Sequence, residues 1–169
     1  ESDSPPGWFQ QVLPVSDQVN DIFFLDSLTG WVCTAGASSG TDTGYVMKTQ
    51  DGGSNWTIQY SQIMNLNVIQ FINNNTGYSG GGNGLAKLFK TTNSGANWTL
   101  HSSLGFITIK DLFFVNADTG WICDDNPING GIFITTNGGS SWQSQLGGSF
   151  FIKKLFFISK DTGWAGSAD

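Results

Sequence analysis

Large apolar side chains recur two residues apart in four short stretches of the chain. This spacing places both members of each pair on one face of a β-strand. The pairs are Ile22 and Phe24, Ile69 and Phe71, Leu112 and Phe114, and Leu155 and Phe157. The residue between them is also apolar in three stretches (Phe23, Phe113 and Phe156) and is Gln70 in the other. Because such strands are apolar on both faces, we expect both faces to be buried.

A Thr-Gly-aromatic marker follows each of these stretches. The four copies stand 47, 43 and 43 residues apart, and each begins a second predicted strand: Thr29-Gly30-Trp31, Thr76-Gly77-Tyr78, Thr119-Gly120-Trp121 and Thr162-Gly163-Trp164. The marker glycine ends a turn, so we expect it to adopt a positive φ. No stretch carries a sustained 3.6-residue apolar stripe, and the pattern predicts an all-β protein.

A glycine-rich turn ending in Trp follows a third predicted strand. It spans residues 49–56, 91–98 and 135–142, and the three Trp residues are 42 and 44 positions apart. A fourth strand begins at each of these Trp residues. Repeats of about 40 to 45 residues with this strand content are typical of the blades of a β-propeller. We therefore predict four-stranded antiparallel blades, with the Trp-containing turn between the third and fourth strands.

Residues 1–7 are expected to form an N-terminal linker, and residues 8–169 a partial propeller. The repeats run approximately over 14–57, 58–99, 100–143 and 144–169. Residues 8–12 resemble a lone copy of the fourth strand, so the prediction is three full blades plus flanking strands, fifteen strands in all. Fifteen strands do not make whole four-stranded blades. We expect either a longer propeller of which this is part, or completion by further copies of the chain.

Charge excludes nucleic acid as a partner. All seven basic residues are Lys, and the 13 acidic residues bring the net charge to −6, which repels a phosphate backbone. No run of about 18 apolar residues predicts a transmembrane segment, and no cofactor or metal site is expected. Cys33 and Cys123 hold the same place in the first and third repeats. Equivalent strands two blades apart lie beyond the limit of about 7 Å for a disulfide, so we expect two free thiols.

The Trp-containing turn, Thr49-x-Asp51-x-Gly53-x-x-Trp56, resembles the Asp-box of the bacterial neuraminidase repeat (BNR). Asn replaces the acid in the other two copies, so we interpret the position as a structural acceptor of backbone N–H groups rather than a catalytic acid. The structural Asp-box set is Thr49, Asp51, Gly53, Trp56, Thr91, Asn93, Gly95, Trp98, Thr135, Asn137, Gly139 and Trp142.

With the Thr-Gly-aromatic marker, the whole repeat is similar to the photosystem II assembly and stability factor type of propeller. That resemblance implies a propeller whose bacterial members are often secreted, and an assembly role for a membrane protein complex in photosynthetic members. Sialidases also carry Asp-boxes, and similarity to them would imply a three-Arg clamp on the substrate. The chain has no Arg, which excludes sialidase activity. Asp-box glycanases need only two carboxylates beside a cleft and are the enzymatic alternative.

Recognition is expected in the loops between the second and third strands, because these vary most among the repeats. The tentative binding residues are Asp42, Asn83, Asp124, Asp125, Asn126 and Asn129. Asp124 and Asp125, with Asp42, could supply a glycanase acid/base pair or oxygen ligands for Ca²⁺, although we favour solvated loop carboxylates. His101 is the only histidine, at a polar position on a fourth strand, and we assign it no catalytic role.

The sequence therefore predicts a noncatalytic β-propeller module for protein or glycan binding and scaffolding. It is expected to be extracellular, periplasmic or at the cell surface. A glycoside hydrolase fragment that uses loop carboxylates is one alternative. An assembly factor for a membrane protein complex is the other.

Overall fold

The computed structural model describes residues 7–36, 43–82, 84–105, 108–124, 126, 128, 130–148 and 150–167. Within these ranges the strands lie close to the predicted ones. They are β1 (Val19–Phe24), β2 (Gly30–Thr34), β3 (Thr43–Thr49), β4 (Thr57–Ile63), β5 (Leu66–Phe71), β6 (Gly77–Gly81), β7 (Lys87–Thr91), β8 (Thr99–Ser103), β9 (Asp111–Phe114), β10 (Gly120–Asp124), β11 (Gly131–Thr135), β12 (Gln143–Gly147), β13 (Ile152–Ser159) and β14 (Thr162–Ser167).

These strands form three four-stranded antiparallel sheets and one two-stranded sheet. Strand order follows the chain within each sheet: β1-β2-β3-β4, β5-β6-β7-β8, β9-β10-β11-β12 and β13-β14. We call these sheets blades one to four. The predicted all-β architecture of four-stranded blades is thereby confirmed.

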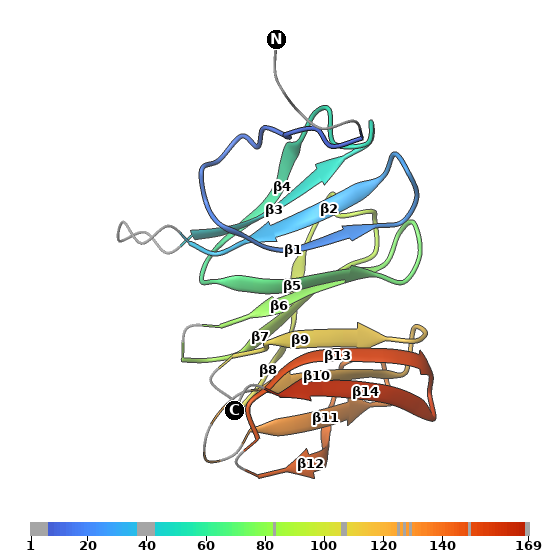
Figure 1. The fold of residues 1–169 in the computed structure, drawn as a ribbon. Helices are drawn as coiled ribbons and strands as arrows, with labels where there is room; N and C mark the ends of the chain where they lie inside the picture. The colour runs from blue at the N-terminus through green and yellow to red at the C-terminus, as the bar shows by residue number, and fades with distance from the viewer. Residues whose placement is uncertain are drawn as a thin grey trace.

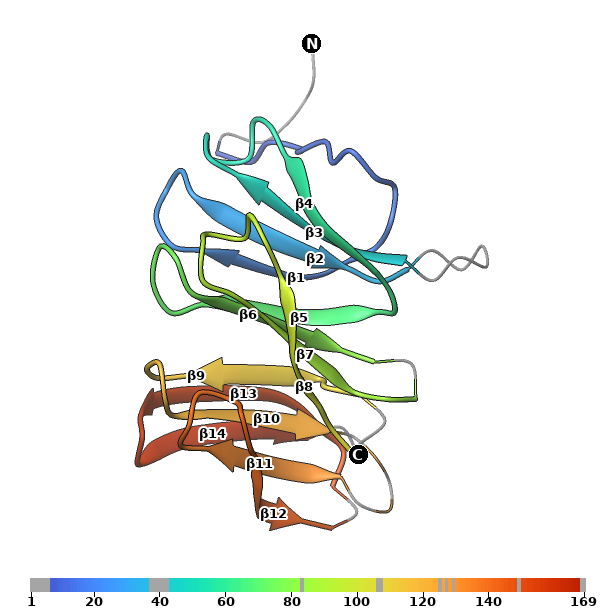
Figure 2. The same ribbon diagram turned by 180° about the vertical axis from the view of Figure 1, so that it is seen from behind.

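The blades lie side by side in chain order, each packed on the next (Figures 1 and 2). The first strand of each blade contacts the first strand of the following one, so β1, β5, β9 and β13 form the inner edge of the arc. Separate apolar clusters fill the spaces between blades one and two, two and three, and three and four. The core is therefore a series of contacts between neighbouring blades.

Stacked aromatic rings repeat at every blade junction. The aromatic residue of each Thr-Gly-aromatic marker lies on the inner-strand Phe of the following blade, with interplanar angles of 14°, 4° and 11°. The centroid distances are 3.6 Å for Trp31–Phe71, 4.1 Å for Tyr78–Phe114 and 3.8 Å for Trp121–Phe157. The marker is thus the main packing element between blades.

The marker glycines do not have the positive φ that we predicted. None of Gly30, Gly77, Gly120 and Gly163 lies in the left-handed region. The reason for glycine is instead steric, because a Cβ on Gly77 would lie 2.7 Å from the ring of Phe71. The preceding turn is fixed by a side chain, as in blade one, where Asp26 Oδ1 accepts the N–H groups of Leu28 at 2.8 Å and Thr29 at 2.7 Å.

The Asp-box-like turns have the internal hydrogen bonds that the sequence predicts. The Thr hydroxyl oxygen accepts the N–H of the turn glycine, at 2.8 Å for Gly53, 3.0 Å for Gly95 and 2.9 Å for Gly139. The Oδ1 of Asp51, Asn93 or Asn137 accepts a backbone N–H four residues later, at 2.9 Å in each turn. Carboxylate and amide therefore serve equally well as the acceptor.

Residues 8–12 are not the strand that we predicted, so the described part of the chain has fourteen strands instead of fifteen. Residues 8–12 nevertheless keep the position relative to the following blade that a fourth strand has. Gln11 lies against the turn glycine Gly53 in the way that His101 lies against Gly139. Leu13 and Val15 pack against the outer side of blade one.

Burial of the inner strands differs between the middle and the ends of the arc. The central inner strand β5 is buried on both faces as predicted. In β1 and β13 the prediction is wrong, since Ile22, Phe24 and Phe156 are exposed. These strands flank the ends of the arc, where one face of the blade has no neighbouring blade.

Both cysteines are buried and unpaired, as predicted. Cys33 belongs to the apolar cluster between blades one and two, and Cys123 to the cluster between blades three and four. Burial raises the pKa of the Cys33 thiol well above its usual value and that of Cys123 to about 12. The described part of the chain contains no helix with the length and apolar character needed to cross a bilayer.

Candidate functional site

One face of the arc carries both the loops between second and third strands and the connections between blades. In blade one the start of β1 pairs with the end of β2, through Val19 and Thr34, and in blade two Leu66 of β5 pairs with Gly81 of β6. The second-to-third loops therefore meet the inter-blade connections at the same end of the strands, on the left in Figure 1. We call this end the loop face.

Exposed apolar side chains gather on the loop face. Two of them lie in loops between second and third strands, and three lie in or beside the connections between blades: Leu85, Ile128, Ile63, Phe150 and Phe151. Ile63 is 77% exposed and Ile128 is 76% exposed. At the opposite ends of the strands Leu28 is exposed in a turn, and Phe24, Ile58 and Ile158 are exposed near the strand ends. Exposed apolar side chains in loops are candidate contacts for a protein partner.

The predicted polar site residues are only partly placed by the structure. Asp42, Asn83, Asp125 and Asn129 lie outside the described residues. Asp124 is described and is 0% exposed, which corrects our interpretation of it as a solvated loop carboxylate. It is the last residue of β10, the second strand of its blade, where Thr34 of β2 is buried too. Asp124 therefore belongs to a buried strand rather than to the loop.

Asn126 has a local structural role. Its side-chain Oδ1 accepts the N–H of Ile128 at 2.9 Å, and its backbone carbonyl accepts the N–H of Gly130 at 2.8 Å. These bonds shape the loop that presents the exposed side chain of Ile128. Sequence reasoning selected the polar residues and missed the apolar one. The signal was an isolated large apolar residue among Asn, Pro and Gly.

A hollow of about 360 Å³ lies at the inner edge of the arc and is lined by the inner strands of all four blades. Two carboxylates line it, Asp21 and Asp111, and burial raises the pKa of both. Buried carboxylates with raised pKa in a hollow are candidates for general acid catalysis. The sequence signal for them was an acid at the start of an otherwise apolar inner strand.

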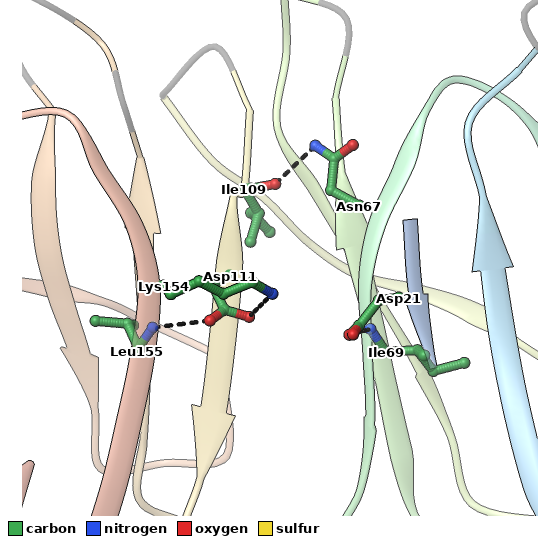
Figure 3. Close-up of polar contacts among 7 residues, drawn as sticks. All are labelled: Asp21, Asn67, Ile69, Ile109, Asp111, Lys154 and Leu155. Carbon is green, nitrogen blue, oxygen red and sulfur yellow. Dashed lines mark hydrogen bonds and ion pairs between the residues drawn. The ribbon is translucent and has the colours of Figure 1, made fainter. Parts of the chain in front are cut away.

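Both carboxylates tie one blade to the next (Figure 3). Asp21 Oδ2 accepts the N–H of Ile69 at 2.9 Å, and Asp111 Oδ2 accepts the N–H of Leu155 at 2.8 Å. The other oxygen of Asp111 lies 3.5 Å from Lys154 Nζ. The geometry therefore gives these acids a structural task between inner strands.

Asparagines extend the same ties toward the loop face. The Asn67 amide donates to the carbonyl of Ile109 at 2.9 Å, also seen in Figure 3, and the Asn20 amide donates to the carbonyl of Leu66 at 2.9 Å. Inner strands that do not share a sheet are thus joined by side chains. This fixes the spacing of the loops that the blades carry.

His101 also contacts the following blade. Its Nε2 lies 2.8 Å from the carbonyl oxygen of Gly138, in the turn of blade three, and burial lowers its pKa. The Tyr78 hydroxyl donates to the same carbonyl at 3.1 Å. These contacts give His101 a packing role at the polar fourth-strand position that the sequence predicted. Among the described residues, no group of three or more His, Cys, Asp or Glu side chains could hold a metal ion.

Comparison with known proteins gives matches in structure only. No family model matches the sequence, and no curated protein matches it. A solved structure of YCF48 bound to D1 peptide superposes with a TM-score of 0.63 at 21% identity, over 78% of this chain and 41% of that one. The GH74 enzyme of Niastella koreensis superposes with a TM-score of 0.67 at 21% identity, over 89% of this chain and 26% of the enzyme.

The chain forms part of a β-propeller. An ancestral GH74 enzyme matches as well, with a TM-score of 0.63 at 15% identity over 90% of this chain and 22% of the enzyme. The propeller segment thus spans about two-fifths of the YCF48 chain and about a quarter of each GH74 chain. At these identities the likeness concerns the fold alone.

Proposed function

We propose that this propeller segment is a noncatalytic, secreted or cell-surface module that binds and scaffolds other molecules through its loop face. The observation that carries the proposal is the group of exposed apolar side chains on that face, Ile63, Leu85, Ile128, Phe150 and Phe151. The aliphatic side chains Ile63, Leu85 and Ile128 suit a protein partner better than a glycan, which is recognised by hydrogen bonds and by stacking on aromatic rings. The structural neighbour YCF48 is bound to a peptide, which supports the same choice.

The placement of carboxylates supports a noncatalytic role. Asp21 and Asp111 accept backbone N–H groups of the following blade, Asp26 and Asp51 hold turns, and Asp124 is buried. A glycosidase needs two carboxyl groups that flank a substrate, about 5.5 Å or about 6.5 to 9.5 Å apart. Asp21, Asp111, Asp26 and Asp51 are instead engaged in holding the blades and turns together.

The binding test uses the intact chain on a peptide array and on a glycan array. We expect peptides to bind and the signal to fall about tenfold or more in the double variant Ile128→Ser with Phe150→Ser, since exposed apolar anchors dominate such interfaces. Leu28→Ser, a matched apolar change on the opposite face, should leave binding unchanged. Binding to glycans alone, or equal loss in both variants, would refute the assignment of the loop face to protein.

The glycanase alternative is favoured by the two GH74 neighbours and uses Asp124 or Asp125. It requires hydrolysis of a β-glucan by the chain and loss of that activity in Asp124→Asn or Asp125→Asn. The third candidate is an assembly factor for a membrane protein complex, which the YCF48 neighbour favours. It predicts preference for peptides from membrane proteins on the same array. Further copies of the chain, or the remainder of a longer propeller, are also proposed partners.

A further inference from the structure

The junction between blades one and two and the junction between blades two and three can be compared residue by residue. At the first junction the ring of Tyr60, on β4, packs against the following blade. Its centroid lies 5.3 Å from that of Phe89 and 6.4 Å from that of Trp98. Tyr60 also packs against the apolar cluster that fills this junction. The outer strand of blade one therefore supplies an aromatic ring to blade two.

Serine replaces this tyrosine at the second junction. Tyr60 pairs with Val46 in blade one. Ser102 pairs with Leu88, which is the residue of blade two that matches Val46. Tyr60 and Ser102 are also both four positions after the Trp of their turns. Strand β8 therefore supplies no ring at the place where β4 supplies one.

A hollow of about 300 Å³ lies at the second junction. Among the described residues, its apolar lining consists of Leu104, Phe133 and Trp142. Phe133 and Trp142 are the blade-three counterparts of Phe89 and Trp98. The exposed fraction is 1% for Phe89 and 7% for Trp98, whereas both counterparts are half-buried. The two rings that Tyr60 covers in blade two thus have counterparts that face a hollow in blade three.

The polar lining of the hollow consists of hydroxyl groups. In the part of the chain that the structure describes, no charged side chain lines it, and four exposed serines form its rim: Ser103, Ser140, Ser141 and Ser144. The hydroxyl oxygen of Ser102 is buried and has no hydrogen-bond partner. A buried hydroxyl without a partner lowers stability. Packing alone therefore does not explain serine at this position.

We propose that this hollow is a second binding site, which receives a tyrosine side chain of a protein partner. The ring would lie against Phe133 and Trp142 as the ring of Tyr60 lies against Phe89 and Trp98. The phenol hydroxyl would reach the rim of serines. Tyrosine combines an apolar ring with one polar group and is a common anchor at protein interfaces. The volume is at the lower end of the roughly 300 to 1,000 Å³ of ligand pockets, which suits a single ring.

The site is independent of the ends of the arc. Blades two and three both have four strands, and one apolar cluster joins them. Further blades of a longer propeller would extend the arc at its ends and would leave this junction as it is. The hollow lies beside the outer strand β8, so it is also separate from the loop face.

The first test uses p-cresol, the tyrosine side chain as a free molecule, with the intact ¹⁵N-labelled chain. We expect p-cresol to shift the indole N–H signal of Trp142, whose Nε1 donates to the carbonyl of Gly139 at 3.1 Å. The signal of Trp98 should stay in place, because Tyr60 already occupies the equivalent space there. Trp142→Phe and Trp98→Phe assign the two signals.

The second test fills the hollow from within the chain. Ser102→Tyr introduces the side chain that the first junction has, so we expect a higher urea midpoint of unfolding and p-cresol binding weaker by about tenfold or more. Leu100→Tyr is the matched control. Leu100 is on the same strand, is 53% exposed and does not line the hollow. This control should leave both the midpoint and p-cresol binding as in wild type.

A peptide array identifies the source of the ring. Tyrosine-containing peptides should bind the wild-type chain, and their signal should fall about tenfold or more in Ser102→Tyr. It should fall equally when the peptide tyrosine is replaced by serine. The loop-face variant Ile128→Ser with Phe150→Ser should keep this binding, so failure of this site and failure of the loop face are told apart.

Several results would overturn the assignment. Absence of a Trp142 shift with p-cresol, or a lower urea midpoint in Ser102→Tyr, would show that the hollow does not accept a ring. A larger shift of the same signal with methyl β-glucoside would assign the site to a sugar. Binding of p-cresol without binding of any tyrosine-containing peptide would assign it to a small phenol instead of a protein partner.

Discussion

At the scale of single residues, the repeat depends on places where only one side chain fits. Each marker glycine lies under the ring of an inner-strand Phe, and that ring is fixed on its other face by a Trp or Tyr at the internal junctions. The sequence showed that glycine is required and suggested a backbone reason. The actual reason is contact between residues six positions apart across a hairpin, which a turn motif alone does not reveal.

Replacing Gly77 by Ala should lower the free energy of unfolding by about 1 to 3 kcal/mol. The added methyl would lie 2.7 Å from the ring of Phe71, which cannot move away because it stacks on Trp31 at 3.6 Å. Urea unfolding followed by Trp fluorescence measures the change. Gly105→Ala is the control, since no heavy atom lies within 4 Å of its Cβ position, and it should change stability by less than about 0.5 kcal/mol. Equal effects of the two substitutions would refute the steric explanation.

Other single residues show why site prediction was harder than turn prediction. The acceptor role of Asp51, Asn93 and Asn137 followed from local spacing, and the three equal distances of 2.9 Å confirm it. The burial of Asp124 did not follow from local spacing. It depends on how the end of β10 is covered, and the polar residues after it gave the appearance of an exposed loop.

At the scale of strands and blades, side chains replace the hydrogen bonds that neighbouring sheets cannot make with one another. The Asp21 carboxylate and the Asn20 amide reach from β1 to the backbone of β5, at Ile69 and Leu66. Strand order and blade boundaries could be predicted because apolar spacing and turn residues are local signals. These ties could not, because they join residues more than 40 positions apart and only in some blades.

The tie made by Asp21 is testable by two matched substitutions. Asp21→Ala removes the acceptor from the buried N–H of Ile69, so we expect a loss of about 1 to 3 kcal/mol in the free energy of unfolding. Asp21→Asn keeps an oxygen acceptor and removes a carboxylate whose pKa is raised, first of all by burial. This variant should be as stable as wild type at pH 7, or more so.

The pH dependence of stability, compared between wild type and Asp21→Asn, tests the direction in which burial shifts the pKa of Asp21. Because the pKa of Asp21 is higher in the folded than in the unfolded chain, the folded state binds the proton more readily. Its stabilising contribution is therefore full below the unfolded pKa of about 3.8 and is lost as pH rises through the folded pKa. The stability of wild type relative to Asp21→Asn should rise as pH falls from 7 toward 4. A constant difference across this range would contradict the assigned burial.

At the scale of the whole molecule, the blades form a one-dimensional series in which each contacts its chain neighbours. The repeat length predicted this series and the Thr-Gly-aromatic marker placed its junctions. The loop face, by contrast, is assembled from segments of several blades, and its apolar members stand alone in the sequence. Only the packing of the blades brings Ile63, Ile128 and Phe150 to one surface. In such a series local opening is expected to start at the weaker end.

The two buried thiols report on opening at different junctions. Cys33 lies between two four-stranded blades, whereas Cys123 faces the two-stranded blade four, whose β14 is exposed along its length. Both thiols resist reaction in the folded state, since burial raises their pKa values. We expect Cys123 to react faster than Cys33 with a thiol reagent at pH 8, measured in the single variants Cys33→Ala and Cys123→Ala. Denaturation without reductant should expose one thiol in each variant and two in wild type. Equal rates for the two cysteines would show that all four blades open together.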